Sequence, residues 1–253
     1  MNGIGWHKPK RLWNRLVAKS LGTVTGVETG AAAVALTFDD GPDPDSTVRL
    51  AEALEKHGAR GTFFVVGRSA RRYPELLERL AGGGHAIGNH SWGHRSFPTL
   101  SSRQRRKQIR LCEKAIRPYG SKIFRPPFGH QDLRSRFDLL LAGYKVVTWS
   151  FLAEDWLDLD AGRILAKIEA KIRPGSIILL HDALFAYLDR KYTDRSATVE
   201  AVEELLERRG RSYDFVTVPQ LLAMGKPRMV DWRRLPDRKW MKKLNQAENR
   251  QPF

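Results

Sequence analysis

The chain has 253 residues, of which 42% are hydrophobic, and its formal net charge is +16. This length and composition fit one α/β domain of barrel size and exclude a chain that is disordered throughout. The single cysteine, Cys112, excludes an intrachain disulfide and gives no reason to place the protein in an oxidising compartment. Because Cys112 falls in a predicted helix, we expect a packed thiol.

The positive charge is concentrated at the two ends of the chain. Residues 1–21 carry five Lys/Arg and no acid, and residues 226–253 carry nine Lys/Arg against three acids. We therefore predict a basic N-terminal extension over residues 1–30, a folded domain over 31–225 and a basic C-terminal tail from 226 onward. Basic tails suit an anionic partner such as a membrane surface, and simple solvated ends explain them equally well.

The N-terminal extension contains one amphipathic pattern. Residues 11–19 can form a short helix that lies on a membrane interface or packs on the barrel. Asn14, Arg15 and Lys19 interrupt its apolar run, so we expect no secretory signal, and no run in the chain reaches the roughly 18 apolar residues of a membrane span. The sequence predicts a cytoplasmic protein that can touch the inner membrane face.

From residue 33 onward, strand patterns alternate with helix patterns. Short apolar runs bounded by glycine or polar residues predict strands at 33–38, 61–67, 85–88, 122–124, 145–149, 176–180 and 213–218. Apolar residues at helical spacing predict helices at 46–56, 73–81, 101–117, 131–142, 161–172, 197–209 and 219–224. About seven βα units favour an α/β fold whose parallel sheet is closed or nearly closed.

Five of these strands end in side chains that bind metals or transfer protons. The clusters are Asp39-Asp40-Gly41-Pro42, His90–His94, Arg125–Gly129, Glu154-Asp155-Trp156 and His181-Asp182. Barrel enzymes carry their chemistry at the carboxyl ends of the strands, where such clusters meet. The pattern predicts a hydrolytic enzyme that depends on a metal.

Asp39 and Asp40 are adjacent, and adjacent residues of a strand point to opposite faces. Both carboxylates can serve one site only if the strand has already ended, which Gly41-Pro42 favours. One acid could then bind a metal while the other accepts a proton. A solvated turn is the alternative.

His90 and His94 are four residues apart, which would place both imidazoles on one side of a helical turn. Together with one carboxylate they would form a set of two histidines and one acid with open positions for water and substrate. Such a set suits zinc, cobalt, nickel or iron.

Arg125 and His181 are candidates for acid–base chemistry. Arg125, on a stiff turn before two prolines, could orient a catalytic carboxylate through a bidentate contact, or form a surface salt bridge. His181 follows four apolar residues, and Asp155 could raise its pKa so that it acts as a general acid. A buried structural histidine is the alternative.

Together these motifs resemble those of NodB-type polysaccharide deacetylases, which form carbohydrate esterase family four. The resemblance rests on Thr37–Pro42, His90–His94, Arg125–Gly129, Asp155-Trp156 and Leu179–His181, and it spans residues 33 to 222 in the family's order. It implies a distorted (β/α) barrel. It also implies a hydrolase that removes an acetyl group, foremost an N-acetyl group, from a carbohydrate such as an oligosaccharide containing N-acetylglucosamine.

The resemblance further implies a role for each matched residue. Asp39 would be the general base, positioned by Arg125, while Asp40, His90 and His94 would hold a divalent metal, with zinc as the first expectation.

For the departure of the leaving group, His181 would be the general acid, and Asp155 would adjust its pKa. The backbone N–H of Phe128 would bind the oxyanion, and Trp156 and Leu179 would line the pocket for the acetyl methyl group.

The chain departs from the family at Leu152, where many members carry a further acid. We expect Gly129–Asp132 and the aromatic loop 183–197 to form the rim of the site. A deacylase of another small amide and a non-catalytic sugar-binding module remain alternatives. Nucleic acid is not expected as a partner, because no recognised binding motif accompanies the basic ends.

Overall fold

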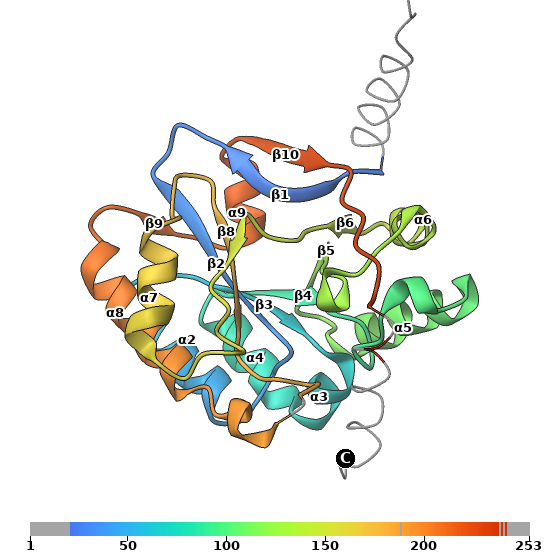
Figure 1. The fold of residues 1–253 in the computed structure, drawn as a ribbon, viewed down its shortest axis with the longest axis horizontal. Coiled ribbons are helices and arrows are strands. Elements are labelled where there is room, and N and C mark those ends of the chain that lie inside the picture. The colour runs from blue at the N-terminus through green and yellow to red at the C-terminus, as the bar shows by residue number, and fades with distance from the viewer. Residues whose placement is uncertain (1–20, 188, 238, 240, 242–253) are drawn as a thin grey trace, which may run out of the picture.

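The computed structural model describes residues 21–187, 189–237, 239 and 241. A curled sheet of parallel strands runs through its centre, with helices packed around it (Figure 1). The strand order is β6-β5-β4-β3-β2-β8-β7, and β9 pairs with β2 beside this path. The strands are β2 (Ala33–Asp39), β3 (Thr62–Val65), β4 (Ala86–Asn89), β5 (Gly120–Phe124), β6 (Lys145–Val146), β7 (Phe151–Leu152), β8 (Ile177–His181) and β9 (Asp214–Phe215). The predicted distorted barrel of about seven parallel strands is confirmed.

The seven helices predicted from residue 33 onward are present, with ends that differ from the prediction by a few residues. The helices are α2 (Ser46–Lys56), α3 (Gly67–Arg72), α4 (Pro74–Gly82), α5 (Ser102–Ala115), α6 (Leu133–Leu141), α7 (Ala161–Glu169), α8 (Ser196–Arg209) and α9 (Val218–Ala223). Capping boxes fix the starts of α5, α6 and α9. The short α3 is an addition, because its six residues hold too few apolar positions to give a helical period.

Strand β2 is the central element of the core, because it is buried on both faces. Val34, Leu36 and Phe38 join the apolar cluster under the outer helices, while Ala33 and Ala35 join a second cluster on the other face. Parallel strands covered on both faces read as continuous apolar runs, which is why the sequence predicted this strand.

Cys112 is fully buried in α5, and its thiol donates to the carbonyl oxygen of Val65 at 3.4 Å. Burial raises the pKa of this thiol to about 12, which keeps it protonated at neutral pH. The expected packed thiol is confirmed.

A second, antiparallel sheet lies across the barrel and was not predicted. It pairs β1 (Thr23–Glu28) with β10 (Lys226–Val230), two segments that the sequence assigned to the basic extension and the basic tail. Gly26 of β1 also forms a bridge with Ser176, at the amino-terminal end of β8. Strands β1 and β10 thereby pair over one end of the barrel, and the chain continues from β10 along the side of the barrel (Figure 1).

The amphipathic pattern of residues 11–19 lies outside the described residues. Within the described part of the chain, none of the helices combines the length and the apolar character that a bilayer span requires.

Candidate active site

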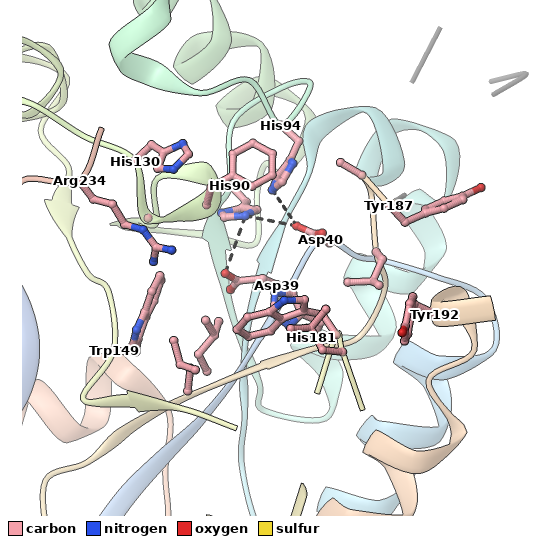
Figure 2. A pocket seen from close by; sticks show the side chains of 18 of the residues that line it. Asp39, Asp40, His90, His94, His130, Trp149, His181, Tyr187, Tyr192 and Arg234 are labelled. Carbon is pink, nitrogen blue, oxygen red and sulfur yellow. Dashed lines mark ion pairs between the residues drawn. The ribbon is translucent and has the colours of Figure 1, made fainter. Parts of the chain in front are cut away.

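The register of the sheet brings the predicted strand ends to one edge. Asp39 of β2 lies opposite His181 of β8, and Asn89, next to His90, lies opposite Phe124, next to Arg125. At this edge a cavity of about 510 Å³ opens, and Figure 2 shows the side chains that line it. The polar and charged members of its lining are Asp39, Asp40, His90, His94, His130, His181, Tyr187, Tyr192, Arg234 and Asp237.

Asp39 and Asp40 both reach this cavity, although they are adjacent in the chain. Asp39 is the last residue of β2, whereas Asp40 has a φ of 82°, so the chain turns out of the strand between them. Such a left-handed conformation is costly for a residue with a side chain and is found mainly at functional sites. It explains why both carboxylates serve one site.

Asp182 holds this turn in place, and the sequence pattern indicated no role for it. Its carboxylate accepts hydrogen bonds from the Gly41 amide at 3.1 Å and from the Thr47 hydroxyl at 2.5 Å. A side chain at Gly41 would collide with the Asp182 carboxylate, which explains the glycine. Burial raises the pKa of Asp182 to about 7, against the effect of these two hydrogen bonds.

His90 and His94 lie close together, but no helix contains them. The helical turn expected between them is wrong: the segment is an irregular loop in which Ser91 and His94 have φ values of 69° and 50°. The loop nevertheless brings the two ring centroids to 5.0 Å. The Nε2 atoms of His90 and His94 lie 3.3 and 3.0 Å from Oδ1 of Asp40, as the dashed lines of Figure 2 show.

The donor atoms of Asp40, His90 and His94 fit a divalent cation. All three residues are buried, and one ligand atom of each lies within 4.8 Å of the others. Nδ1 of His90 donates to the carbonyl oxygen of Arg125 at 2.8 Å, which leaves the lone pair of Nε2 toward Asp40. Burial alone would raise the pKa of Asp40, but His94 and His90 hold that pKa well below its usual value. Two imidazole nitrogens thus converge on one carboxylate oxygen.

Arg125 is fully buried beneath Asp39. One nitrogen, Nη1, donates to Oδ1 of Asp39 and to the Thr37 hydroxyl, each at 2.7 Å, and Nη2 donates to the carbonyl oxygen of Thr148 at 2.7 Å. The contact with Asp39 is therefore made through one nitrogen, and the expected bidentate pair is wrong, because backbone carbonyls occupy the rest of the guanidinium. Arg125 fixes the Asp39 carboxylate and leaves Oδ2 facing the cavity.

His181 and Asp155 form the second acid–base pair. Nδ1 of His181 donates to Oδ1 of Asp155 at 3.0 Å, and the backbone N–H of His181 donates to Oδ2 at 2.8 Å. Burial lowers the pKa of His181, but the Asp155 carboxylate outweighs this effect and raises the pKa to about 9. The structure thus brings Asp155 into contact with His181, as the sequence predicted.

Asp155 is itself held by residues that the sequence pattern did not identify. The buried Arg195 donates to the carbonyl oxygen of Asp155 at 3.1 Å and to its Oδ2 at 3.4 Å, and the Thr198 hydroxyl donates to Oδ2 at 3.3 Å. Arg195 precedes α8, which carries Thr198. Only the packing of α8 against the barrel brings these residues together, so no local pattern could have identified them.

The remaining predicted residues also line the cavity, Phe128 beside His94 and Trp156 beside His181. Phe128 has a φ of 59°, and its ring meets the His94 ring edge-on at 4.4 Å. Trp156 and Leu179 line the cavity beside His181, and Leu152 joins them. An apolar side chain therefore stands where many family members carry an acid.

The rim is built from two parts of the chain. Tyr187 and Tyr192 of the predicted aromatic loop lie on one side, and Phe185 of the same loop donates its backbone N–H to Oδ2 of Asp40 at 3.0 Å. Arg234 comes from the predicted C-terminal tail and lies on the opposite side, next to Trp149 (Figure 2).

Comparisons with known proteins agree with this geometry. The profile of the polysaccharide deacetylase family matches residues 26–147. A peptidoglycan-N-acetylglucosamine deacetylase of Bacillus cereus is 31% identical over 202 residues, which are 78% of this chain and 70% of that protein. The chain belongs to the polysaccharide deacetylase family.

Two further family members support this assignment. A chitooligosaccharide deacetylase of Bradyrhizobium is 33% identical over 78% of this chain and 93% of its own length. A crystal structure of a peptidoglycan N-acetylglucosamine deacetylase superposes with a TM-score of 0.76 at 27% identity, over 85% of this chain and 99% of that one. The chain spans only about two fifths of the length of some other family members.

Proposed function

We propose that this carbohydrate deacetylase hydrolyses the N-acetyl group of an N-acetylglucosamine unit in an oligosaccharide or polysaccharide intermediate. The observation that carries the proposal is the pairing of two acid–base groups with three metal donors in one cavity. Asp39 and its Arg125 stand beside the donors, and His181 with Asp155 lies in register across the sheet. The names of the B. cereus and Bradyrhizobium relatives support the choice of an acetylated amino sugar.

Asp40, His90 and His94 would hold the metal, for which zinc is our first choice. Two imidazoles and one carboxylate with an open position are a common set for catalytic zinc, and cobalt, nickel and iron accept the same donors. When bound there, a divalent metal polarises the acetyl carbonyl and makes a neighbouring water more acidic.

In this proposal Asp39 acts as the general base. Its Oδ1 is occupied by Arg125, so Oδ2, 3.8 Å from Nε2 of His90, is the oxygen that faces the metal donors. Oδ2 accepts a proton from the attacking water as the new carbon–oxygen bond forms. The buried Arg125 keeps the carboxylate in this orientation throughout the step.

In this proposal His181 acts as the general acid. Its Nδ1 is committed to Asp155, so Nε2 carries the proton that the leaving amine requires. As the carbon–nitrogen bond breaks, Nε2 transfers this proton to the amine, and acetic acid leaves and ionises to acetate in solvent. The proton on Asp39 then returns to Nε2 of His181 through solvent, which restores both groups. The backbone N–H of Phe128 would stabilise the negative charge on the carbonyl oxygen in between.

The cavity offers an apolar wall for the acetyl methyl group. Leu152, Trp156 and Leu179 form an apolar wall beside His181, and an apolar wall favours a methyl group over a charged acyl substituent. The edge-on contact of Trp156 with His181, at 5.3 Å between ring centroids, also keeps this wall next to the proton donor.

Acetate release tests the proposal. Purified protein loaded with zinc or cobalt would be mixed with fully acetylated chito-oligosaccharides, and chelated protein and the His181→Ala variant would be run in parallel. We expect release that requires the metal and falls by about a hundredfold or more in the variant. Asp45→Asn, whose side chain is 76% exposed away from the cavity, is the matched control and should keep full activity.

The alternatives appear as different outcomes of the same assay. Release from simple acetamides but not from saccharides would favour a deacylase of other small amides. Saccharide binding without any release by metal-loaded protein would favour a non-catalytic binding module. The cytoplasmic location and the membrane contact through the basic ends stay predictions from the sequence.

A further inference from the structure

The segment that follows β10 is anchored at the edge of the cavity. Asp231 forms an ion pair with the buried Arg136 of α6, and the indole N–H of Trp232 donates to the carbonyl oxygen of Gly129 at 3.0 Å. Gln131 and Arg234 then exchange backbone hydrogen bonds at 2.9 and 3.2 Å. These contacts fix the backbone of Arg234 against the loop that carries Phe128.

Arg234 presents its guanidinium to the cavity. Figure 2 shows the side chain between His130 and Trp149, directed toward the centre of the site. The neighbouring Arg233 lines no part of the cavity and pairs with Asp231 at 2.9 Å. Asp237 lines the same cavity, and none of the ion pairs between described residues involves Arg234.

Arg234 is the one lysine or arginine among the described residues that line the cavity. Burial lowers the pKa of the adjacent His130 to about 4, and the charges of Arg234 and His94 add to the effect, so His130 is neutral at neutral pH. The wall between the metal donors and Arg234 is continuous. The Phe128 ring lies 4.4 Å from that of His94 and 5.4 Å from that of His130.

We propose that Arg234 binds an anionic group, a carboxylate or a phosphate, on a sugar unit next to the one that is deacetylated. This inference rests on the proposed function and names the substrate class: an acetylated saccharide that carries negative charge. A guanidinium matches both anions, because its planar N–H groups can donate two parallel hydrogen bonds. An exposed arginine by itself would not indicate a binding site. Arg234 differs because its backbone is anchored and its guanidinium faces the cavity, with no ion pair to another described residue.

Three trisaccharide probes test this subsite. They are acetylated chitotriose, the same trisaccharide oxidised to carboxylates at C6, and the same trisaccharide phosphorylated at C6. Metal-loaded wild type, Arg234→Gln, Arg234→Lys and the matched control Arg233→Gln would be compared by acetate release. We expect Arg234→Gln to lower kcat/KM about tenfold or more for at least one anionic probe, mainly through KM, and less than twofold for the neutral one.

The variants and the salt dependence sharpen this expectation. Arg234→Lys should retain part of the preference, because it keeps the charge and loses the planar fork. Arg233→Gln should leave all three probes unchanged. The preference for the anionic probes should shrink as salt rises, since Arg234 is exposed. A larger loss with one anion than with the other identifies carboxylate or phosphate as the natural group.

Two results would overturn the inference while leaving the proposed function intact. One is an equal effect of Arg234→Gln on all three probes, and the other is no preference of the wild type for either anion. If the wild type releases acetate from none of them, the dissociation constants of the probes, measured by calorimetry with and without Arg234→Gln, still decide whether the subsite exists. That outcome would count against the proposed function separately.

Discussion

The cavity has two sides that are built differently. On the side of the strand ends, Asp39, Arg125 and Asp155 are buried at 4%, 0% and 0% exposure. Arg125 and Asp155 each have several hydrogen-bond partners, and Arg125 holds Asp39. On the side of the C-terminal segment, Arg234 is exposed, and its hydrogen bonds to other described residues are made by its backbone. Proton transfer requires fixed geometry and little water, whereas selection among substrates needs only a correctly placed charge. The comparison predicts that substitutions on the first side reduce kcat and those on the second raise KM.

The largest loss of kcat is expected from substitution of the general base, Asp39. Asp39→Asn removes the proton acceptor but keeps the hydrogen-bonding shape beside Arg125, so kcat should fall by about a thousandfold. The metal content and the melting temperature should stay close to those of the wild type. Steady-state acetate release together with metal analysis checks this. Activity within tenfold of the wild type would mean that another group accepts the proton.

The second-largest effect is expected from substitution of a metal donor. His94→Ala removes one of three donors, so the affinity for zinc should fall by more than about a hundredfold, a larger loss than outer-shell changes cause. Chelator competition measures this change without any substrate. Arg95→Ala, the exposed neighbour, should bind metal as the wild type does. Unchanged affinity in His94→Ala would remove His94 from the site.

The pH dependence of kcat tests whether His181 is the general acid. His181 must be protonated to act, and its pKa is raised to about 9, so kcat should hold at neutral pH and fall as pH rises through the alkaline range. Asp155→Asn removes the carboxylate that raises this pKa and leaves burial to lower it. The alkaline limb should therefore move to lower pH, and kcat at pH 8 should fall by at least tenfold.

The matched control for this profile is Glu154→Gln, which makes the same charge change one residue away on a side chain that is 50% exposed. Glu154→Gln should leave the alkaline limb of the kcat profile at the same pH as in the wild type. An unmoved limb in Asp155→Asn would mean that a group other than His181 sets it.

The smallest effect is expected in the C-terminal segment. Trp232→Ala removes the hydrogen bond to Gly129 and the edge-on contact with Trp149, at 5.2 Å between ring centroids. Each contact contributes about 1 kcal/mol, so KM for saccharides should rise about three- to tenfold while kcat changes less than twofold. Met229→Ala, on the exposed β10, is the control. A loss of kcat comparable to that of Asp39→Asn would end the distinction between the two sides.

Much of the cavity side that the strand ends form could be predicted from the sequence. Buried parallel strands give short apolar runs, and their carboxyl ends share one edge, so the strand pattern is enough to place Asp39, His90, Arg125 and His181 together. The local geometry was harder to predict. The helical turn at His90 and His94 and the bidentate contact of Arg125 were wrong, because loop conformation and competing carbonyl acceptors depend on the surrounding barrel.

The chain order and chemistry of the strand-end motifs, together with the apolar runs that lead to them, were determined by the sequence itself. Tertiary structure alone decided which distant segments complete the site. Arg195 reaches Asp155 from the start of α8, and Arg234 reaches the cavity because β10 pairs with β1, about 200 residues earlier in the chain. Local patterns reflect short-range energetics, whereas contacts over such separations form only when the whole barrel has closed.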